Sequence, residues 1–200
     1  MSSTHPPVEV VGSDAERLLH FNRLLIDQAL SLVDAHEVPG APAYGHYTGP
    51  HLRHVIEHYE ALLLRGTDSD LDYDRRPRDG ALDQSARIAR VRLCGLKQHL
   101  ADAEDTTLDR PVHVRGQGGV TGEFDFVTRS SVGRELVFLA SHAIHHFALL
   151  RIYCQQHGIP TDPDFGRAPS TVAHAKAATA SASPIEPRKE SACLTSQSAA

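Results

Sequence analysis

The sequence predicts an all-α protein, a four-helix bundle with a short β-hairpin between its third and fourth helices. Apolar residues recur at helical spacing in four long segments. Capping residues and Gly/Pro pairs bound these segments, and one glycine-rich stretch alternates with the period of a strand. We expect a flexible N-terminus over residues 1–13, the bundle over 14–160, and a low-complexity, disordered tail over 161–200.

The first two helices are predicted from their caps and their apolar faces. Ser13 and Glu16 fit a capping box, in which each side chain accepts a hydrogen bond from the other's backbone amide. The first helix should run over residues 14–36 until Pro39 and Gly40 stop the chain. The second should run over 49–65, with Thr48 as its cap and Pro50 in its first turn, where a missing amide hydrogen costs little.

The middle of the chain predicts a loop, a third helix and the hairpin. Residues 66–80 are charged and rich in turn formers. Leucine and alanine then mark one helical face over 81–104. Two alternating stretches, 112–114 and 124–127, are separated by four glycines and favour a short hairpin: Gly116, Gly118, Gly119 and Gly122.

The fourth helix is predicted from Ser130 or Ser131 to His157, and Gly158 followed by Pro160 ends it. Its apolar residues cover a wide arc, which is typical of a largely buried helix. We therefore expect His142 and His146 to face the interior.

Composition excludes several functions. Lys and Arg total 20 against 25 Asp and Glu, a formal charge of −5, which argues against binding the nucleic-acid backbone. The uninterrupted apolar runs are shorter than the roughly 20 residues of a spanning helix, so we expect no membrane span. No secretory signal is visible, which favours the cytoplasm. The three cysteines form no Cys-x-x-Cys pair, and we expect Cys94 and Cys154 to be buried in helices while Cys193 lies in the polar tail.

Histidine is the unusual residue, with 14 in the chain. Six lie in two short clusters that the sequence places on the second and fourth helices: His51, His54, His58, His142, His145 and His146. The pair four residues apart, His142 and His146, projects from one helix face one turn apart, the spacing at which two imidazoles bind one ion. A third imidazole from the second helix would make a three-His site with open positions, which is typical of catalytic metal sites. The spacing leaves open which of the three supplies it.

The alternative is that these histidines lie on helix surfaces or that an ion only ties two helices together. Ala143 follows His142, so the peptidase signature His-Glu-x-x-His, which carries its own general base, is absent. A fourth protein ligand such as His58 or Glu57 would favour a structural ion, and three ligands with an open position would favour catalysis.

Three stretches carry a resemblance to a known family. GPHLRHVIEHYEALLL at 49–64, DYDRRPRD at 72–79 and SSVGRELVFLASHAIHHFALL at 130–150 resemble the DinB/YfiT-like metalloenzyme superfamily. The resemblance covers roughly residues 14–157 and implies a DinB-like four-helix bundle with one divalent metal ion. It implies His54, His142 and His146 as the metal ligands. Relatives often continue with Arg-Gly-Gln where this chain has Phe147, Ala148 and Leu149.

The resemblance also implies a class of chemistry. Members activate a low-molecular-weight thiol or water on the metal, as S-transferases or hydrolases, and the ion would be Zn or Ni, with Fe or Mn as further choices. We expect Glu57 and His145 as catalytic residues beside the metal, and Tyr73 and Arg76 as substrate-binding residues for a small molecule. A homodimer is expected from the resemblance. The competing hypothesis is a non-catalytic, metal-stabilised helical bundle with a structural or stress-response role.

Overall fold

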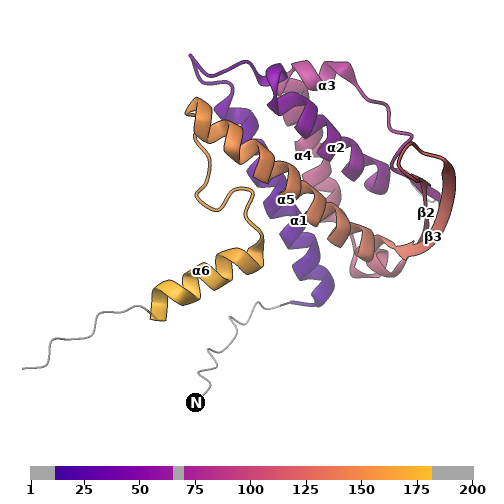
Figure 1. Ribbon diagram of the computed structural model, residues 1–200. Coiled ribbons are helices and arrows are strands. Elements are labelled where there is room, and N and C mark those ends of the chain that lie inside the picture. Colours follow the sequence, from indigo (N-terminus) through magenta and orange to yellow (C-terminus); the bar gives the residue numbers. More distant parts are fainter. Residues whose placement is uncertain (1–11, 65–69, 182–200) are drawn as a thin grey trace, which may run out of the picture. The chain divides into compact units, whose positions relative to one another are not determined.

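The structure is a computed structural model that describes residues 12–64 and 70–181. The chain is mostly helical and carries a small three-stranded sheet. The long helices are α1 (Asp14–Ala35), α2 (Thr48–Leu63), α4 (Ala86–Asp102) and α5 (Val132–His157), and the labels in Figure 1 follow this order. Both α1 and α2 pack against α4 and α5, and their apolar faces form one core.

The ends of α1 and α5 follow the predicted signals. Ser13 and Glu16 form the capping box of α1. The Ser131 hydroxyl accepts from the Arg134 amide at 3.2 Å and caps α5. Gly158 ends α5 in the left-handed conformation, with φ 66°, which glycine adopts without steric cost. The start of α1 and both ends of α5 are therefore set by local sequence.

Two predictions for the second and third helices were wrong: the cap of the second and the continuity of the third. Thr48 does not cap α2; it is fully buried, and its hydroxyl bonds with His36 Nε2 at 2.8 Å. The third predicted helix is two helices, α3 (Gly80–Gln84) and α4, because Ser85 takes an extended conformation and accepts from the Ile88 amide. Gly49 of α2 packs so close to this break that a Cβ there would fall 1.8 Å from the Asp83 carbonyl oxygen.

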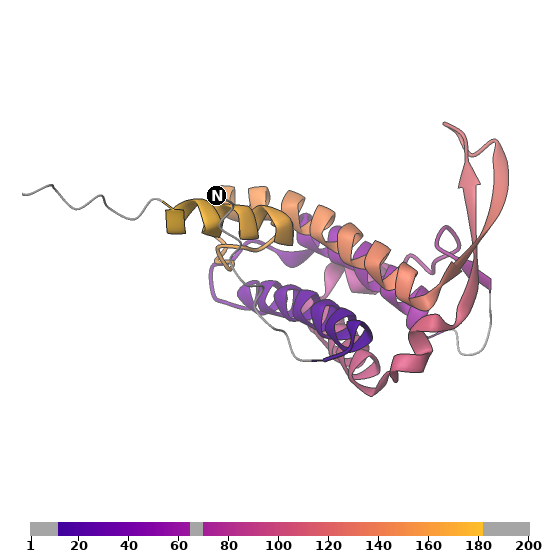
Figure 2. The same cartoon turned by 90° about the horizontal axis from the view of Figure 1, so that it is seen from below.

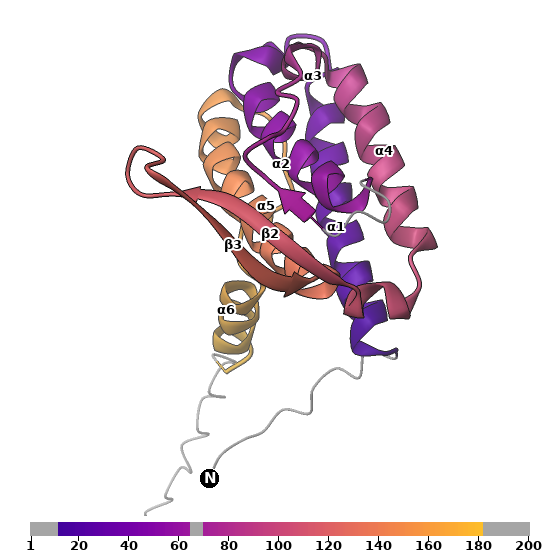
Figure 3. The same ribbon diagram turned by 90° about the vertical axis from the view of Figure 1, so that its right-hand side faces the viewer.

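The sheet consists of β1 (Asp70–Asp72), β2 (Pro111–Gly118) and β3 (Phe124–Ser131), in the order β1-β2-β3. The two strands of the glycine-rich segment, β2 and β3, pair antiparallel from Pro111↔Ser131 to Gly118↔Phe124. Figures 2 and 3 show this hairpin crossing and extending past the helices. The parallel strand β1 lies where only a loop was expected, because its pairing partner is distant in sequence.

The short elements η1 (Tyr44–His46) and η2 (Asp105–Asp109) lead into α2 and β2. After α5 the chain returns to the core at Phe165, which is 2% exposed and stacks on Phe147 at 5.1 Å between ring centroids. The compact unit ends at Ala168, past the boundary expected at residue 160. Pro169–Ser181 then form α6, a helix where a disordered tail was expected. The rest of the expected tail, 182–200, and residues 1–11 lie outside the described residues.

The exposure of one cysteine and the hydropathy of α5 differ from what the sequence predicted. Cys154 is buried as expected, but Cys94 is exposed on α4, while Cys193 lies outside the described residues. Burial raises the pKa of Cys154 to about 11. Within the described ranges, α5 is the helix that is long and apolar enough to cross a membrane by length and composition, a test that buried core helices also pass. Its buried side chains belong to the core described above.

Candidate metal centre

Helices α2 and α5 pack together and bring three histidines to one point. His54 comes from α2, and His142 and His146 from α5. One ligand atom from each lies within 4.8 Å of the others, and the ring centroids are 4.7 to 4.9 Å apart. These are the residues that the resemblance implied, and this group could hold a metal ion.

The state of the three imidazoles fits a cation. The pKa of His54 and of His146 is lowered to about 3, first by burial and then by neighbouring imidazoles, with Arg76 adding to the effect at His54. Burial also lowers the pKa of His142. All three rings are therefore neutral near pH 7, the form that binds metal. Nε2 of His142 is buried without a hydrogen-bond partner in the described part of the chain, so a ligand there would satisfy it.

His51 contacts the cluster from outside. Its Nδ1 lies 2.9 Å from Nδ1 of His146, and its ring packs at a tilt against Tyr47, with 4.7 Å between the ring centroids. When His146 donates its Nδ1 proton to His51, its Nε2 carries a lone pair that can bind a cation. His51 is thus a hydrogen-bond partner of a candidate ligand.

His58 lies close to the cluster, but its nitrogens have other partners. Nδ1 donates to the His54 carbonyl oxygen at 2.6 Å, so Nε2 is the acceptor nitrogen of the neutral ring. That Nε2 lies 3.3 Å from Nη1 of Arg76, a group that can only donate. His58 thus contacts a backbone oxygen and Arg76, and it lies outside the group of three histidines.

Arg76 covers the cluster on one side. Its Nη2 lies 3.1 Å from Nδ1 of His54, and its side chain is 9% exposed. It also lines a cavity of about 300 Å³ together with Glu57 and Arg75. Arg76 thus contacts a candidate metal ligand and also lines this cavity.

Glu57 points to Arg76 and not to the histidines. Its Oε1 accepts from the Asp79 amide at 2.7 Å, and its Oε2 lies 3.7 Å from Nε of Arg76. The side chain is fully buried, and its hydrogen bond from Asp79 ties α2 to the loop that carries Arg76.

Tyr73 is buried beside His58, whereas His145 is exposed beside His146. Tyr73 stacks on His58 at 5.2 Å and donates its hydroxyl to Glu135 at 2.9 Å; burial, followed by the Glu135 charge, raises its pKa. His145 is exposed, with its ring 5.5 Å from that of His146. Sequence reasoning did not single out Phe138, which stacks on His142 at 5.6 Å; its place four residues before His142 was the available signal.

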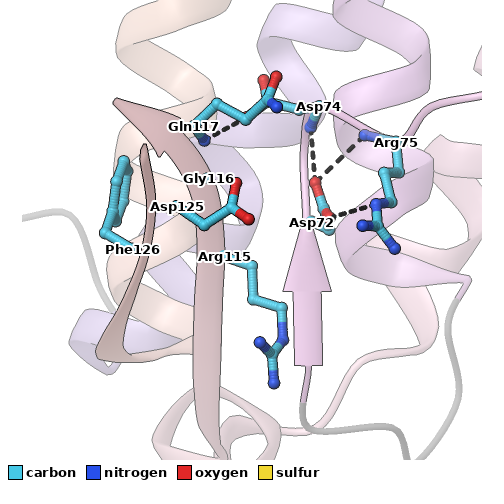
Figure 4. Close-up of a pocket in the computed structure, with 8 residues that line it drawn as sticks. All are labelled: Asp72, Asp74, Arg75, Arg115, Gly116, Gln117, Asp125 and Phe126. Atoms are coloured by element: carbon cyan, nitrogen blue, oxygen red, sulfur yellow. Dashed lines mark hydrogen bonds and ion pairs between the residues drawn. The ribbon is translucent and has the colours of Figure 1, made fainter. Parts of the chain in front are cut away.

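A second cavity lies on the sheet, lined by charged residues of β1, β2 and β3, and Figure 4 shows these side chains. It measures about 200 Å³. Asp72 accepts from the amides of Asp74 and Arg75, and Asp74 accepts from the Gln117 amide. These carboxylates satisfy backbone amides, so the histidine cluster is the stronger candidate site.

Comparisons with known proteins add one similarity. Over 106 residues the chain is 30% identical to FK506-binding protein 5 of Rhizopus delemar, a match that spans 53% of this chain and 28% of that protein. The chain thus covers less than a third of that relative's length. No family model matches the sequence. No solved structure matches it.

Proposed function

We propose that this protein is a divalent-metal-dependent enzyme that uses His54, His142 and His146 as ligands and acts as a thiol S-transferase or a hydrolase. The observation that carries the proposal is the convergence of the three neutral imidazoles from α2 and α5. A divalent ion in such a site supplies Lewis acidity, which activates a bound thiol or water.

We infer that the four long helices form a DinB-like four-helix bundle. The packing of α1 and α2 against α4 and α5 supports this inference. So does the position of the three histidines, which are the ones that the family resemblance implies. The similarity to FK506-binding protein 5 covers 28% of that protein, so we assign no ligand to this chain from it.

The surrounding residues take roles that follow from their contacts. Arg76 binds an anionic group of a small substrate that enters the adjoining cavity, which suits a carboxylated low-molecular-weight thiol. Glu57 and Tyr73 hold the Arg76 segment in place, through the hydrogen bond from the Asp79 amide to Glu57 and the hydrogen bond from Tyr73 to Glu135. His145 is exposed beside His146 and is placed to exchange protons with solvent.

The competing function is a structural ion in a non-catalytic bundle. It requires a fourth protein ligand that closes the coordination shell. His58 and Glu57 were the candidates, and neither belongs to the group of three residues whose ligand atoms lie within 4.8 Å of one another. Their arrangement favours an open position and therefore an enzyme.

Elemental analysis tests the site. Protein reconstituted separately with Zn, Ni, Fe and Mn, then freed of unbound ion, should retain about one ion per chain. His54→Ala, His142→Ala and His146→Ala should lose it. His145→Ala is the matched control because it removes an exposed imidazole from the same helix. Absence of bound metal in the wild type, or equal retention in all variants, would refute the site.

Removal of the metal distinguishes a catalytic ion from a structural one. A structural ion contributes folding energy outright, so its removal should unfold the protein or lower Tm sharply. We expect the chelated protein to keep its helical circular dichroism and most of its Tm. The metal-loaded protein should then consume a low-molecular-weight thiol in the presence of an electrophile, or hydrolyse an ester, and the chelated protein should do neither. Collapse of the fold on chelation would favour the structural ion.

Three imidazole ligands suit Zn or Ni, with Fe or Mn as further choices. We propose a cytoplasmic protein that acts on a small molecule, and neither a nucleic acid nor a membrane is needed for that activity.

A further inference from the structure

Strand β3 is an edge strand. It pairs with β2 along one side, and along the other side the described residues supply no strand. The hairpin extends beyond the helices, as Figure 2 shows, so a second molecule can approach this edge. Eight residues, Phe124–Ser131, therefore present a row of backbone donors and acceptors that can pair with another strand.

Several of the usual protections of such an edge are missing from β3. The register with β2 runs unbroken, without a bulge, and the segment contains neither Lys nor Pro. Large apolar side chains are exposed along it: Phe124 is 59% exposed, Phe126 44% and Val127 53%. A long, regular, apolar edge of this kind is stabilised when another strand covers it.

The charges on β3 are arranged symmetrically about Val127. Asp125 lies two residues before it and Arg129 two residues after it, so all three share one face of the sheet. The two charges are about 13 Å apart along the strand, too far to pair with each other. Within the described ranges neither forms an ion pair. An antiparallel copy of the same strand would place each charge opposite its complement.

We propose that two copies of this chain pair antiparallel through their β3 edges, about a two-fold axis at Val127. In this register Asp125 lies opposite the partner's Arg129, and the symmetry repeats the pair. Val127 then faces the partner's Val127, and Phe126 faces the partner's Thr128. The two three-stranded sheets become one sheet of six strands, and the exposed apolar side chains gain cross-strand neighbours.

The charge pattern supplies the register. A shift along the edge separates both opposite-charge pairs at once and breaks the Val127 contact. The interface uses no residue of the histidine cluster, so this proposal is independent of the metal site.

Charge reversal in the full-length protein tests the pairing. Sedimentation equilibrium should give the wild type twice the 21.8 kDa mass of the chain. Asp125→Arg and Arg129→Asp each place like charges opposite each other twice, so each should raise the dimer dissociation constant about tenfold or more. The double variant Asp125→Arg/Arg129→Asp exchanges the charges and should dimerise like the wild type.

Mixing the two single variants provides the decisive control. One variant then carries two arginines and the other two aspartates at the paired positions, so the mixture should form a heterodimer of wild-type strength. A misfolded variant could not be restored in this way. A monomeric wild type, or a dimer that both single variants leave intact, would overturn the proposal.

Discussion

His51 acts on the candidate site through another residue. Its Nδ1 contacts Nδ1 of His146 at 2.9 Å, and a hydrogen bond there holds the His146 ring in place and leaves Nε2 to bind a cation. We predict that His51→Ala raises the metal Kd about 10- to 100-fold, the usual cost of losing a partner of a ligating histidine. Competition with a chromophoric chelator measures the Kd.

The control for His51→Ala is the stability of the metal-free protein. The metal-free variant should keep the Tm and the helical circular dichroism of the metal-free wild type, because the side chain lies at the edge of the core and not within it. An unchanged metal Kd would show that His146 needs no orienting partner.

Arg76 places a positive charge beside the same site. Its guanidinium lies 3.1 Å from Nδ1 of His54 and opposes a divalent cation electrostatically. We predict that Arg76→Gln lowers the metal Kd about tenfold while it weakens binding of an anionic substrate. Isothermal titration with Zn measures the first effect.

Arg75→Gln is the matched control for Arg76, since Arg75 is the preceding residue and its side chain is 87% exposed. It should leave the metal Kd unchanged. If the two variants behave alike, the effect reflects the net charge of the protein and not the contact with His54.

At the scale of the elements, two glycines have open space around them and opposite backbone conformations. Gly158 ends α5 with φ 66°, and Gly95 lies within α4; a Cβ would meet no atom within 4 Å at either. Gly158→Ala should lower the free energy of unfolding by about 1 kcal/mol, because it forces alanine into the left-handed region. Gly95→Ala should raise it by about 0.5–1 kcal/mol, because alanine favours the helix. Urea denaturation compares them, and equal effects would contradict the conformational argument.

At the scale of the whole molecule, the compact unit ends at Ala168. No described side chain of α6 is buried. A chain truncated after Ala168 should therefore keep the Tm and the metal content of the full protein, as calorimetry and elemental analysis will measure.

A chain truncated after Pro160 should behave differently. It loses Phe165, which is 2% exposed and stacks on Phe147, and burial of a phenylalanine is worth about 3 kcal/mol or more. We expect a marked fall in Tm. Equal stability of the two truncated chains would mean that Phe165 contributes little to the core.

The sequence by itself determined what depends on near neighbours. The capping box at Ser13, the end of α5 at Gly158 and the antiparallel pairing of β2 with β3 all involve residues close in sequence, and their signals were readable. The shared face of His142 and His146 followed in the same way, since both lie on one helix.

The tertiary structure decided what depends on distant neighbours. The helical spacing left His51, His54 and His58 open as the third member of the cluster, and the packing of α2 against α5 turns His54 toward the pair. The break at Ser85, the parallel strand β1 and the return of Phe165 to the core also join residues far apart in sequence. The periodicity of one helix fixes which residues share a face. The direction of that face depends on the rotation of the helix against its neighbours, which only packing sets.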